Sequence, residues 1–383
     1  MKKYILIVIA LWLVWPLENS RSAEVAWHKI STRQNIAMSS KYYHAVPDVV
    51  VGVVDGGIDY THPDLQGQLW DGGEKYPHHG YDFTGPDNDP RSSNPHGTWV
   101  AGIIANMAPN AKIAALRAVD TCDCSFEGVF PALVKFAIAQ KIKILNVSLG
   151  FSASKINSKR MQQTIQSYQD FGGLIVCSAG NKKEDNDQSP QFPCSFTYDC
   201  IISVAACDQD DCLAYFSNWG LNSVDIAAPG IAITGPSYAG KYLTGSGTSA
   251  STPMVSALAA YLWGVNPKLS AQEIKDIILQ TATPCPNLED KILTGGKINF
   301  WNAFEKAAGP IQQKYLCYKN VAITLETRIN GWQQAIVYDL PSQFLTGTHT
   351  QIFLGDRALN LAKSEIDFWQ KQNIQFKQCD CPP

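Results

Sequence analysis

One serine stands where a glycine-containing loop meets an apolar helix. The stretch "YLTGSGTSASTPMVSALAAYLWGV" (Tyr242–Val265) places Ser249 between Gly247 and an almost wholly apolar run that begins at Ala250. A serine at this place can cap the helix, since its side-chain oxygen accepts from free N–H groups of the first turn. It can also be a nucleophile whose own N–H faces developing negative charge. That second role requires a base, a group that orients the base and a further oxyanion donor.

His96 and Asp55 are the candidates for the base and its orienting group. His96 lies in "NPHGTWVAGIIA", where a Pro-His-Gly turn opens an apolar helix; a histidine with only a capping role is the alternative. His62, in "THPDL", is expected to be a turn residue. Asp55 ends the apolar stretch "VVVGVVD", and a carboxylate buried there must be paired or hydrogen-bonded. An imidazole would satisfy it, and loop amides are the alternative.

The segments that must position these side chains have the composition of parallel strands. Several short runs are nearly continuous in apolar residues, which is typical of strands buried on both faces. These runs are Asp48–Asp55, Ala111–Asp120, Lys141–Gly150, Gly173–Gly180 and Cys200–Cys207. Helix-like segments alternate with them, which predicts an α/β fold with a doubly wound, mostly parallel sheet. Working sites of such sheets lie at the carboxyl ends of the strands, where Asp55, "NVSLG" and "SAGN" are found.

Three blocks of this sequence resemble the signature blocks of subtilisin-like serine proteases, the subtilase family. They are "VVDGGIDYTHPDL" with Asp55, "HGTWVAG" with His96 and "GTSASTPMVSA" with Ser249. Their order is that of the subtilisin triad. The resemblance covers residues 48–308 and includes "APNAKIAALRAV", "ILNVSLG", "IVCSAGN", "DIAAPG" and "GGKINFWNAF". It implies a subtilisin-like fold and a serine endopeptidase in which Asp55 orients His96 and His96 activates Ser249.

The same resemblance implies further site residues. Asn181, after "SAG", matches the family's side-chain oxyanion donor, and a left-handed turn residue is the alternative. Extended peptides bind such enzymes by strand-like backbone pairing. The segments expected to pair with the two sides of the substrate are Ser148, Leu149 and Gly150, and Asp123, Cys124 and Ser125. The "CDC" sequence at the second edge departs from the small, flexible residues that are usual in the family.

A cluster of acidic residues is a weak calcium candidate. Asp82, Asp87 and Asp89 lie in "GYDFTGPDNDPRSSN", which resembles a calcium loop of some relatives, and oxygen-rich loops suit this ion. An ordinary cluster of Asp and Asn turns is the favoured alternative, because Arg91 follows closely. No cofactor is expected to be required. Zinc is not expected at the Cys-x-Cys pairs, because no nearby histidine completes the usual ligand spacing.

The N-terminal residues predict an export signal. Lys2 and Lys3 precede the apolar run Tyr4–Trp15, which is shorter than the ~20 residues of a spanning helix. Cleavage is expected before Ala23, which makes residues 1–22 the signal peptide; an uncleaved anchor is the alternative. The predicted location is secreted or periplasmic, without membrane contact after cleavage.

Export places the 11 cysteines in an oxidising compartment, where disulfides are expected. Their odd number leaves at least one unpaired within the chain, and Cys177 in "GLIVCSAGN" is the expected free thiol. The pairs near enough in sequence to close short loops are Cys194 with Cys200 and Cys207 with Cys212. The pairing of the others stays open. One hypothesis joins the "CDC" at residues 379–381 to the "CDC" at residues 122–124.

The chain of 383 residues is expected to comprise a peptidase domain and a small C-terminal addition. The divisions are residues 1–22 (signal), 23–47 (N-terminal segment), 48–308 (peptidase domain) and 309–383 (C-terminal module of unknown role). In this α+β module, "VAITLETRI" and "QAIVYDL" are expected to be strands and "LNLAKSEIDFWQKQ" a helix. The net charge of -3, with no basic block, argues against a nucleic-acid partner.

The functional prediction is a secreted serine endopeptidase that acts on protein or peptide substrates through an acyl-enzyme. The family's inhibitory pro-domain does not fit between Ala23 and Asp48. Activity is therefore expected to be restrained by other means, with the C-terminal module as one candidate. The alternative is a catalytically silent relative that binds peptides or serves as a scaffold. The sequence does not predict the oligomeric state.

Overall fold

The computed structural model describes residues 27–34, 47–85, 87–119, 126–152 and 159–309, and four further strands between residues 312 and 354. Its centre is a nine-stranded sheet in the order β12-β13-β9-β8-β6-β4-β1-β3-β2. The strands are β1 (Val49–Asp55), β2 (Gly80–Asp82), β3 (Ala111–Arg117), β4 (Ile144–Val147), β6 (Leu174–Ser178), β8 (Ile201–Cys207), β9 (Ile226–Pro229), β12 (Thr283–Pro284) and β13 (Gly296–Lys297). Neighbours pair in parallel except β12 with β13. Strands β1, β3, β4, β6 and β8 lie in the runs predicted from sequence.

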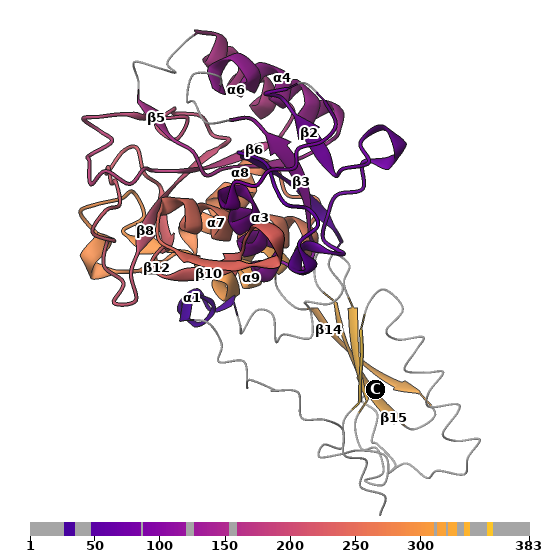
Figure 1. The fold of residues 1–383 in the computed structure, drawn as a ribbon. Helices are drawn as coiled ribbons and strands as arrows, with labels where there is room; N and C mark the ends of the chain where they lie inside the picture. Colours follow the sequence, from indigo (N-terminus) through magenta and orange to yellow (C-terminus); the bar gives the residue numbers. More distant parts are fainter. Residues whose placement is uncertain are drawn as a thin grey trace, which may run out of the picture.

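Helices cover both faces of this sheet (Figure 1). They are α3 (Pro95–Met107), α4 (Phe126–Ala139), α6 (Lys159–Asp170), α7 (Thr248–Val265), α8 (Ala271–Gln280) and α9 (Phe300–Ala308). In β1, Val51 and Val53 pack into the core that contains α3 and α7. Val54 packs instead into the core that contains α4 and α6. Successive strand residues thus bury opposite faces, which explains why these strands are apolar throughout. The doubly wound, mostly parallel sheet is confirmed.

Helix α7 lies in the middle of the larger core. All but one of its residues are buried, the exception being Ser249, which is half-buried. The helix packs against α3, α8 and α9 and against the central strands β1, β4, β6, β8 and β9. This burial fixes the start of the helix relative to the carboxyl ends of those strands.

Two short antiparallel pairs lie outside the nine-stranded sheet. Strand β5 (Phe151–Ser152) pairs with β7 (Gln191–Phe192), and β10 (Ile233–Pro236) pairs with β11 (Tyr242–Gly245). The β10–β11 hairpin packs on α3, where Trp99 Nε1 donates to the carbonyl oxygen of Ile233 at 3.1 Å. The hairpin leads directly into α7.

The C-terminal region contains a four-stranded antiparallel sheet (Figure 1). Its strands are β14 (Gln312–Tyr318), β15 (Val321–Thr327), β16 (Gln333–Val337) and β17 (Gln351–Leu354). The two predicted strands of this region correspond to β15 and β16. The predicted C-terminal helix, the signal peptide and the two Cys-x-Cys pairs lie outside the described residues.

Near the start of the chain, hydrogen bonds join the short helix α1 (Trp27–Ser31) and the residues after it to distant segments. The Phe300 N–H donates to the carbonyl oxygen of Thr32, and Gln34 Nε2 donates to that of Met107. In the part of the chain that the structure describes, no helix combines the length and the apolar character needed to cross a bilayer.

The described cysteines do not form the predicted disulfides. Cys177, Cys194, Cys200, Cys207, Cys212 and Cys285 are all free thiols, so neither the Cys194–Cys200 nor the Cys207–Cys212 bridge is formed. Cys177 is free and fully buried, as expected. Both proposed bridges rested on proximity in sequence and on the expected compartment. Cys194 and Cys200 instead pack as small apolar side chains in the core on the α4 and α6 side.

Candidate active site

Asp55 and His96 form a close pair at the end of β1. Asp55 is the last residue of the strand and is 2% exposed. Its Oδ1 and Oδ2 lie 2.9 and 2.8 Å from Nδ1 of His96, and Oδ1 also accepts the Gly56 N–H at 2.7 Å. A carboxylate accepts from Nδ1–H, so Nε2 is left as the unprotonated nitrogen when the ring is neutral. The sequence suggested either an imidazole or loop amides as partners of this carboxylate, and it has one of each: His96 and the Gly56 N–H.

Two local features hold His96 in this position. The Asn94 side chain caps α3 by accepting the His96 N–H at 3.0 Å. The next residue, Gly97, allows the helix to approach β1 closely, since a Cβ there would lie 2.2 Å from the carbonyl oxygen of Gly57 and 3.1 Å from Asp55 Cβ. A larger residue at position 97 would push the helix away from the carboxylate.

The environment of His96 raises its pKa. Burial of the imidazole acts to lower the pKa of His96, but the charge and hydrogen bond of Asp55 together outweigh this effect. The pKa of His96 therefore lies above its ordinary value of 6.5. A raised pKa makes the ring a stronger base, which suits proton abstraction from a hydroxyl.

Ser249 is the second residue of α7 and lines the same cavity as Asp55 and His96. Its hydroxyl donates to the carbonyl oxygen of Ser148 at 3.1 Å, and the Ser148 hydroxyl donates to the carbonyl oxygen of Ser249 at 3.2 Å. The structure thus brings the three residues to one cavity, with the serine hydroxyl bonded to Ser148. Hydrogen bonds of catalytic groups are often poorly aligned before a substrate is bound.

The cavity has a volume of about 500 Å³ and lies across the carboxyl ends of β1, β4 and β6. Its lining residues are Asp55, Gly56, Asn94, His96, Val119, Ser148, Leu149, Gly150, Phe151, Ser178, Gly180, Asn181, Lys182, Gln191 and Ser249. The predicted substrate residues Ser148, Leu149 and Gly150 are among them. The other predicted edge, Asp123, Cys124 and Ser125, lies outside the described residues.

Asn181 is oriented by the first residue of α7. Its Oδ1 accepts the N–H of Thr248 at 2.8 Å and the Thr248 hydroxyl at 2.9 Å. With the oxygen engaged, Nδ2 is the end of the amide that can serve a ligand as a donor. The preceding Gly180 has a φ of 114°, so the left-handed conformation lies there and not at Asn181.

A family model described as the subtilase family matches residues 47–311. This chain belongs to the subtilase family. The thermophilic serine proteinase of Bacillus sp. (strain AK1) is 35% identical over 269 residues, which are 66% of this chain and 61% of that relative. Thermitase of Thermoactinomyces vulgaris is 33% identical over 245 residues, 61% of this chain and 80% of thermitase.

The fold comparison agrees with the family assignment. The crystal structure of a cold-adapted subtilisin-like serine proteinase matches with a TM-score of 0.55 and 26% identity, over 64% of this chain and 88% of that one. The chain spans less than two thirds of the length of the thermophilic relative, 61% of it.

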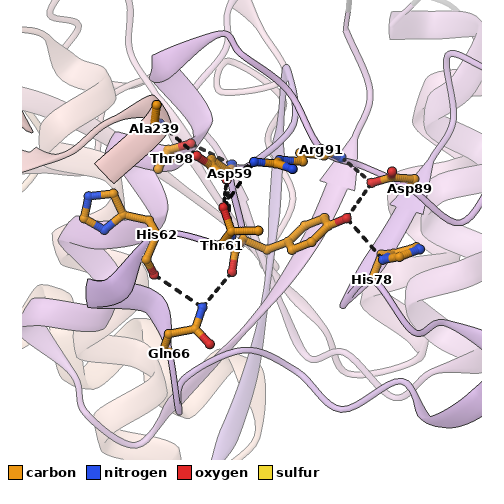
Figure 2. Close-up of polar contacts among 10 residues, drawn as sticks. Asp59, Thr61, His62, Gln66, His78, Asp89, Arg91, Thr98 and Ala239 are labelled. Carbon is orange, nitrogen blue, oxygen red and sulfur yellow. Dashed lines mark hydrogen bonds and ion pairs between the residues drawn. The ribbon is translucent and has the colours of Figure 1, made fainter. Parts of the chain in front are cut away.

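A buried carboxylate outside the cavity connects the parts of this subtilase that carry the site (Figure 2). Asp59, 0% exposed, accepts the Ala239 N–H at 2.9 Å and both the N–H and the hydroxyl of Thr61. Arg91 pairs with it at 3.4 Å. The Asp59 N–H donates to the Thr98 hydroxyl at 2.8 Å. These bonds join the loop after β1, the helix of His96 and the tip of the β10–β11 hairpin, and we call them the Asp59 clamp.

His62 belongs to the same region and has a structural role. Its Nδ1 accepts the Asp64 N–H at 3.1 Å and caps the short helix η2 (Pro63–Leu65), as expected for a turn residue. Its Nε2 lies 3.0 Å from the carbonyl oxygen of Lys241 at the hairpin tip. With Nδ1 accepting, Nε2–H must be the donor, so the neutral ring joins the two segments.

The acidic cluster does not fit the calcium prediction. Asp82 accepts the N–H and the hydroxyl of Thr84 at 2.7 Å each, and its other oxygen pairs with Arg117 at 3.1 Å. Asp87 and Asp89 accept N–H groups two residues further on. These are the turn contacts of the alternative interpretation. Within the described ranges no group of three or more His, Cys, Asp or Glu side chains is arranged to hold a metal ion.

Eight lining residues of this subtilase were not predicted from the sequence, and Lys182, Phe151 and Gln191 are among them. Lys182 directly follows Asn181 in "SAGNK", a signal that could have been used. Phe151 directly follows the predicted segment Ser148–Gly150, so its neighbours could likewise have indicated it. No sequence signal indicated Gln191, since the pairing of β7 with β5 brings it to the cavity.

Proposed function

We propose that this subtilase is a secreted serine endopeptidase that hydrolyses peptide bonds of protein or peptide substrates through an acyl-enzyme. The Asp55–His96 pair carries the proposal, with contacts of 2.8 and 2.9 Å in the same cavity as the Ser249 hydroxyl. A neutral imidazole held at Nδ1 presents Nε2 as a proton acceptor, which is what a general base requires. Secretion rests on the sequence of residues 1–22.

The first step is proton transfer from Ser249 to His96. The hydroxyl must leave the Ser148 carbonyl oxygen, and rotation about the Cα–Cβ bond of Ser249 is the motion that redirects it. His96 then takes the proton while Oγ attacks the substrate carbonyl carbon. Asp55 stabilises the imidazolium that forms, without taking the proton itself.

The negative oxygen of the tetrahedral intermediate needs donors that are already in place. The N–H of Ser249, at the start of α7, and Nδ2 of Asn181 are the proposed donors, and Thr248 holds the Asn181 amide in that orientation. His96 next gives its proton to the leaving amine, and a peptide with a new N-terminus departs. Water then attacks the acyl-enzyme with His96 as base and regenerates Ser249.

A catalytically silent, peptide-binding relative is the second candidate. The observation that favours it is the hydrogen bond from the Ser249 hydroxyl to Ser148, which turns the proton away from the base. Two features argue against this candidate, because a binding protein needs neither of them. They are the paired carboxylate and imidazole, and the amide oriented by two hydrogen bonds. The endopeptidase is therefore the function we propose.

The Ser249→Ala variant tests the proposal. Peptidase activity of the full chain should be abolished, while the free energy of unfolding changes by less than ~1 kcal/mol, because Ser249 is half-buried. Ser167→Ala, an exposed serine on α6, is the matched control and should keep full activity. Unchanged hydrolysis in Ser249→Ala would contradict the assignment, and inactive wild-type protein would favour the silent relative.

A further inference from the structure

The cavity extends past Ser249, away from His96. Strands lie in the order β6-β4-β1, with Asp55 at the end of β1 and Asn181 and Lys182 just after β6. His96 must face the leaving amine, because it gives that group its proton. The side chain of the acyl residue, whose carbonyl is attacked, therefore extends toward the part beside β4 and β6. The residues that line that part are Leu149, Gly150, Phe151, Ser178, Gly180, Lys182 and Gln191.

One cation stands among these residues. Among the described residues that line the cavity, the titratable ones are Asp55, His96 and Lys182, and the Asp55 carboxylate is engaged by His96. No ion pair joins Lys182 to a carboxylate of the described residues. An ammonium at the rim of a concave site attracts an anionic group that enters it.

Next to this cation lie an amide and an apolar wall. Gln191 is 5% exposed, and β7 holds it against β5. Among the described residues, its Nε2 makes one long contact, 3.5 Å to the carbonyl oxygen of Ser189, so the amide can turn a donor to a ligand. Phe151, also 5% exposed, stacks on Phe126 with ring centroids 4.8 Å apart. A buried amide and a rim ammonium suit a carboxylate carried on a short aliphatic stem.

We propose that Lys182 and Gln191 select substrates whose acyl residue is acidic, with glutamate preferred over its neutral isostere glutamine. The proposal deepens the proposed endopeptidase function and rests on it. Lys182 supplies the charge at the mouth of the pocket and Gln191 a donor inside it. Neither residue takes part in proton transfer, so both act on the choice of substrate.

The test uses a pair of chromogenic peptide anilides that differ only in having Glu or Gln as the acyl residue. Wild-type kcat/KM should be about tenfold higher for Glu, which corresponds to about 1.4 kcal/mol. In Lys182→Glu the ratio should fall below one, and Lys182→Arg should keep most of the preference. Lys183→Glu is the matched control, with the same change in net charge at a residue outside the cavity lining; its ratio should stay near that of wild type.

Several results would overturn the proposal. Equal kcat/KM for the two peptides in wild type would do so, as would a ratio that Lys182→Glu leaves unchanged. A ratio that falls equally in Lys182→Glu and Lys183→Glu would show a general charge effect and no specific site. Failure of the proposed function is distinguishable, because the protein would then cleave neither anilide and would not react with a fluorophosphonate, which needs no acidic group.

Discussion

At the scale of single residues, the proposed chemistry depends on one carboxylate–imidazole pair. Asp55 is buried at the end of a strand and is satisfied by Gly56 and His96, so the cost of burying its charge is offset by these contacts. The pair can be predicted from sequence because both residues stand in recognisable blocks at element ends. Asp59 stands in one of those blocks but was not singled out, because its partners, Arg91 and Ala239, are distant in the chain.

The raised pKa of His96 predicts the pH dependence of hydrolysis. The protonated ring cannot accept the Ser249 proton, so kcat/KM should rise with pH as His96 loses its proton, with a midpoint above the ordinary value of 6.5. The measurement is a pH profile of kcat/KM at low substrate concentration. A midpoint below that value would contradict the assigned role of Asp55.

Asp55→Asn should shift this midpoint. Without the carboxylate, burial acts alone and lowers the pKa of His96, so the midpoint should move to lower pH. The maximal rate should also fall by about 10⁴-fold, the loss that this change causes in another Ser-His-Asp triad. An unchanged midpoint would mean that another group sets the pH profile.

At the scale of elements, the site is assembled where strand ends meet the start of a buried helix. Strands β1, β4 and β6 and helix α7 could be predicted because long apolar runs mark them. The pairs β5–β7 and β10–β11 could not, since they have two to four residues per strand and depend on contacts between distant segments. Gln191 and the hairpin tip therefore could not be placed from sequence alone.

The Asp59 clamp should stabilise this assembly. Asp59→Asn removes a buried charge that accepts bonds from Ala239 and Thr61, and we expect it to lower the free energy of unfolding by about 1–3 kcal/mol. Asp64→Asn, an exposed carboxylate on the same loop, should change it by less than ~0.5 kcal/mol. Urea denaturation of the three proteins measures both differences. Equal stability of the two variants would mean that the clamp contributes little.

The clamp also has a predicted pH dependence. Burial alone would raise the pKa of Asp59, but the bonds from Thr61 and Ala239 and the charge of Arg91 lower it below its ordinary value of 3.8. A lowered pKa stabilises the folded protein above the unfolded-state value, and this stabilisation is lost as the pH falls through the folded-state value. The stability difference between wild type and Asp59→Asn should therefore shrink upon acidification below about pH 4.

At the scale of the whole molecule, the described part of the sheet is covered by a large core on each face. The sequence predicts this architecture well, because successive residues of each strand must all be apolar for both faces to be covered, and such continuous apolar runs are easily recognised. It predicts the cysteine pairing poorly. Their proximity in sequence predicted a disulfide between Cys194 and Cys200, yet both thiols are free and buried.

Alkylation with iodoacetamide at pH 8 should distinguish these thiols. Burial raises the pKa of Cys194 and of Cys200 to about 12, so both should stay unmodified in the native protein, while half-buried Cys212 reacts. In denaturant without reductant, all three should be modified, as peptide mass spectrometry would show. Modification of Cys194 and Cys200 only after reduction would indicate that the predicted bridge exists.

The most direct test of the account is covalent labelling of the full chain with a fluorophosphonate, followed by peptide mass spectrometry. The proposed triad predicts one phosphonyl group per chain, on the peptide that carries Ser249, and labelling slower by at least ~10²-fold in His96→Ala. An unlabelled Ser249, or equal labelling rates in wild type and His96→Ala, would contradict the claim that His96 activates this serine.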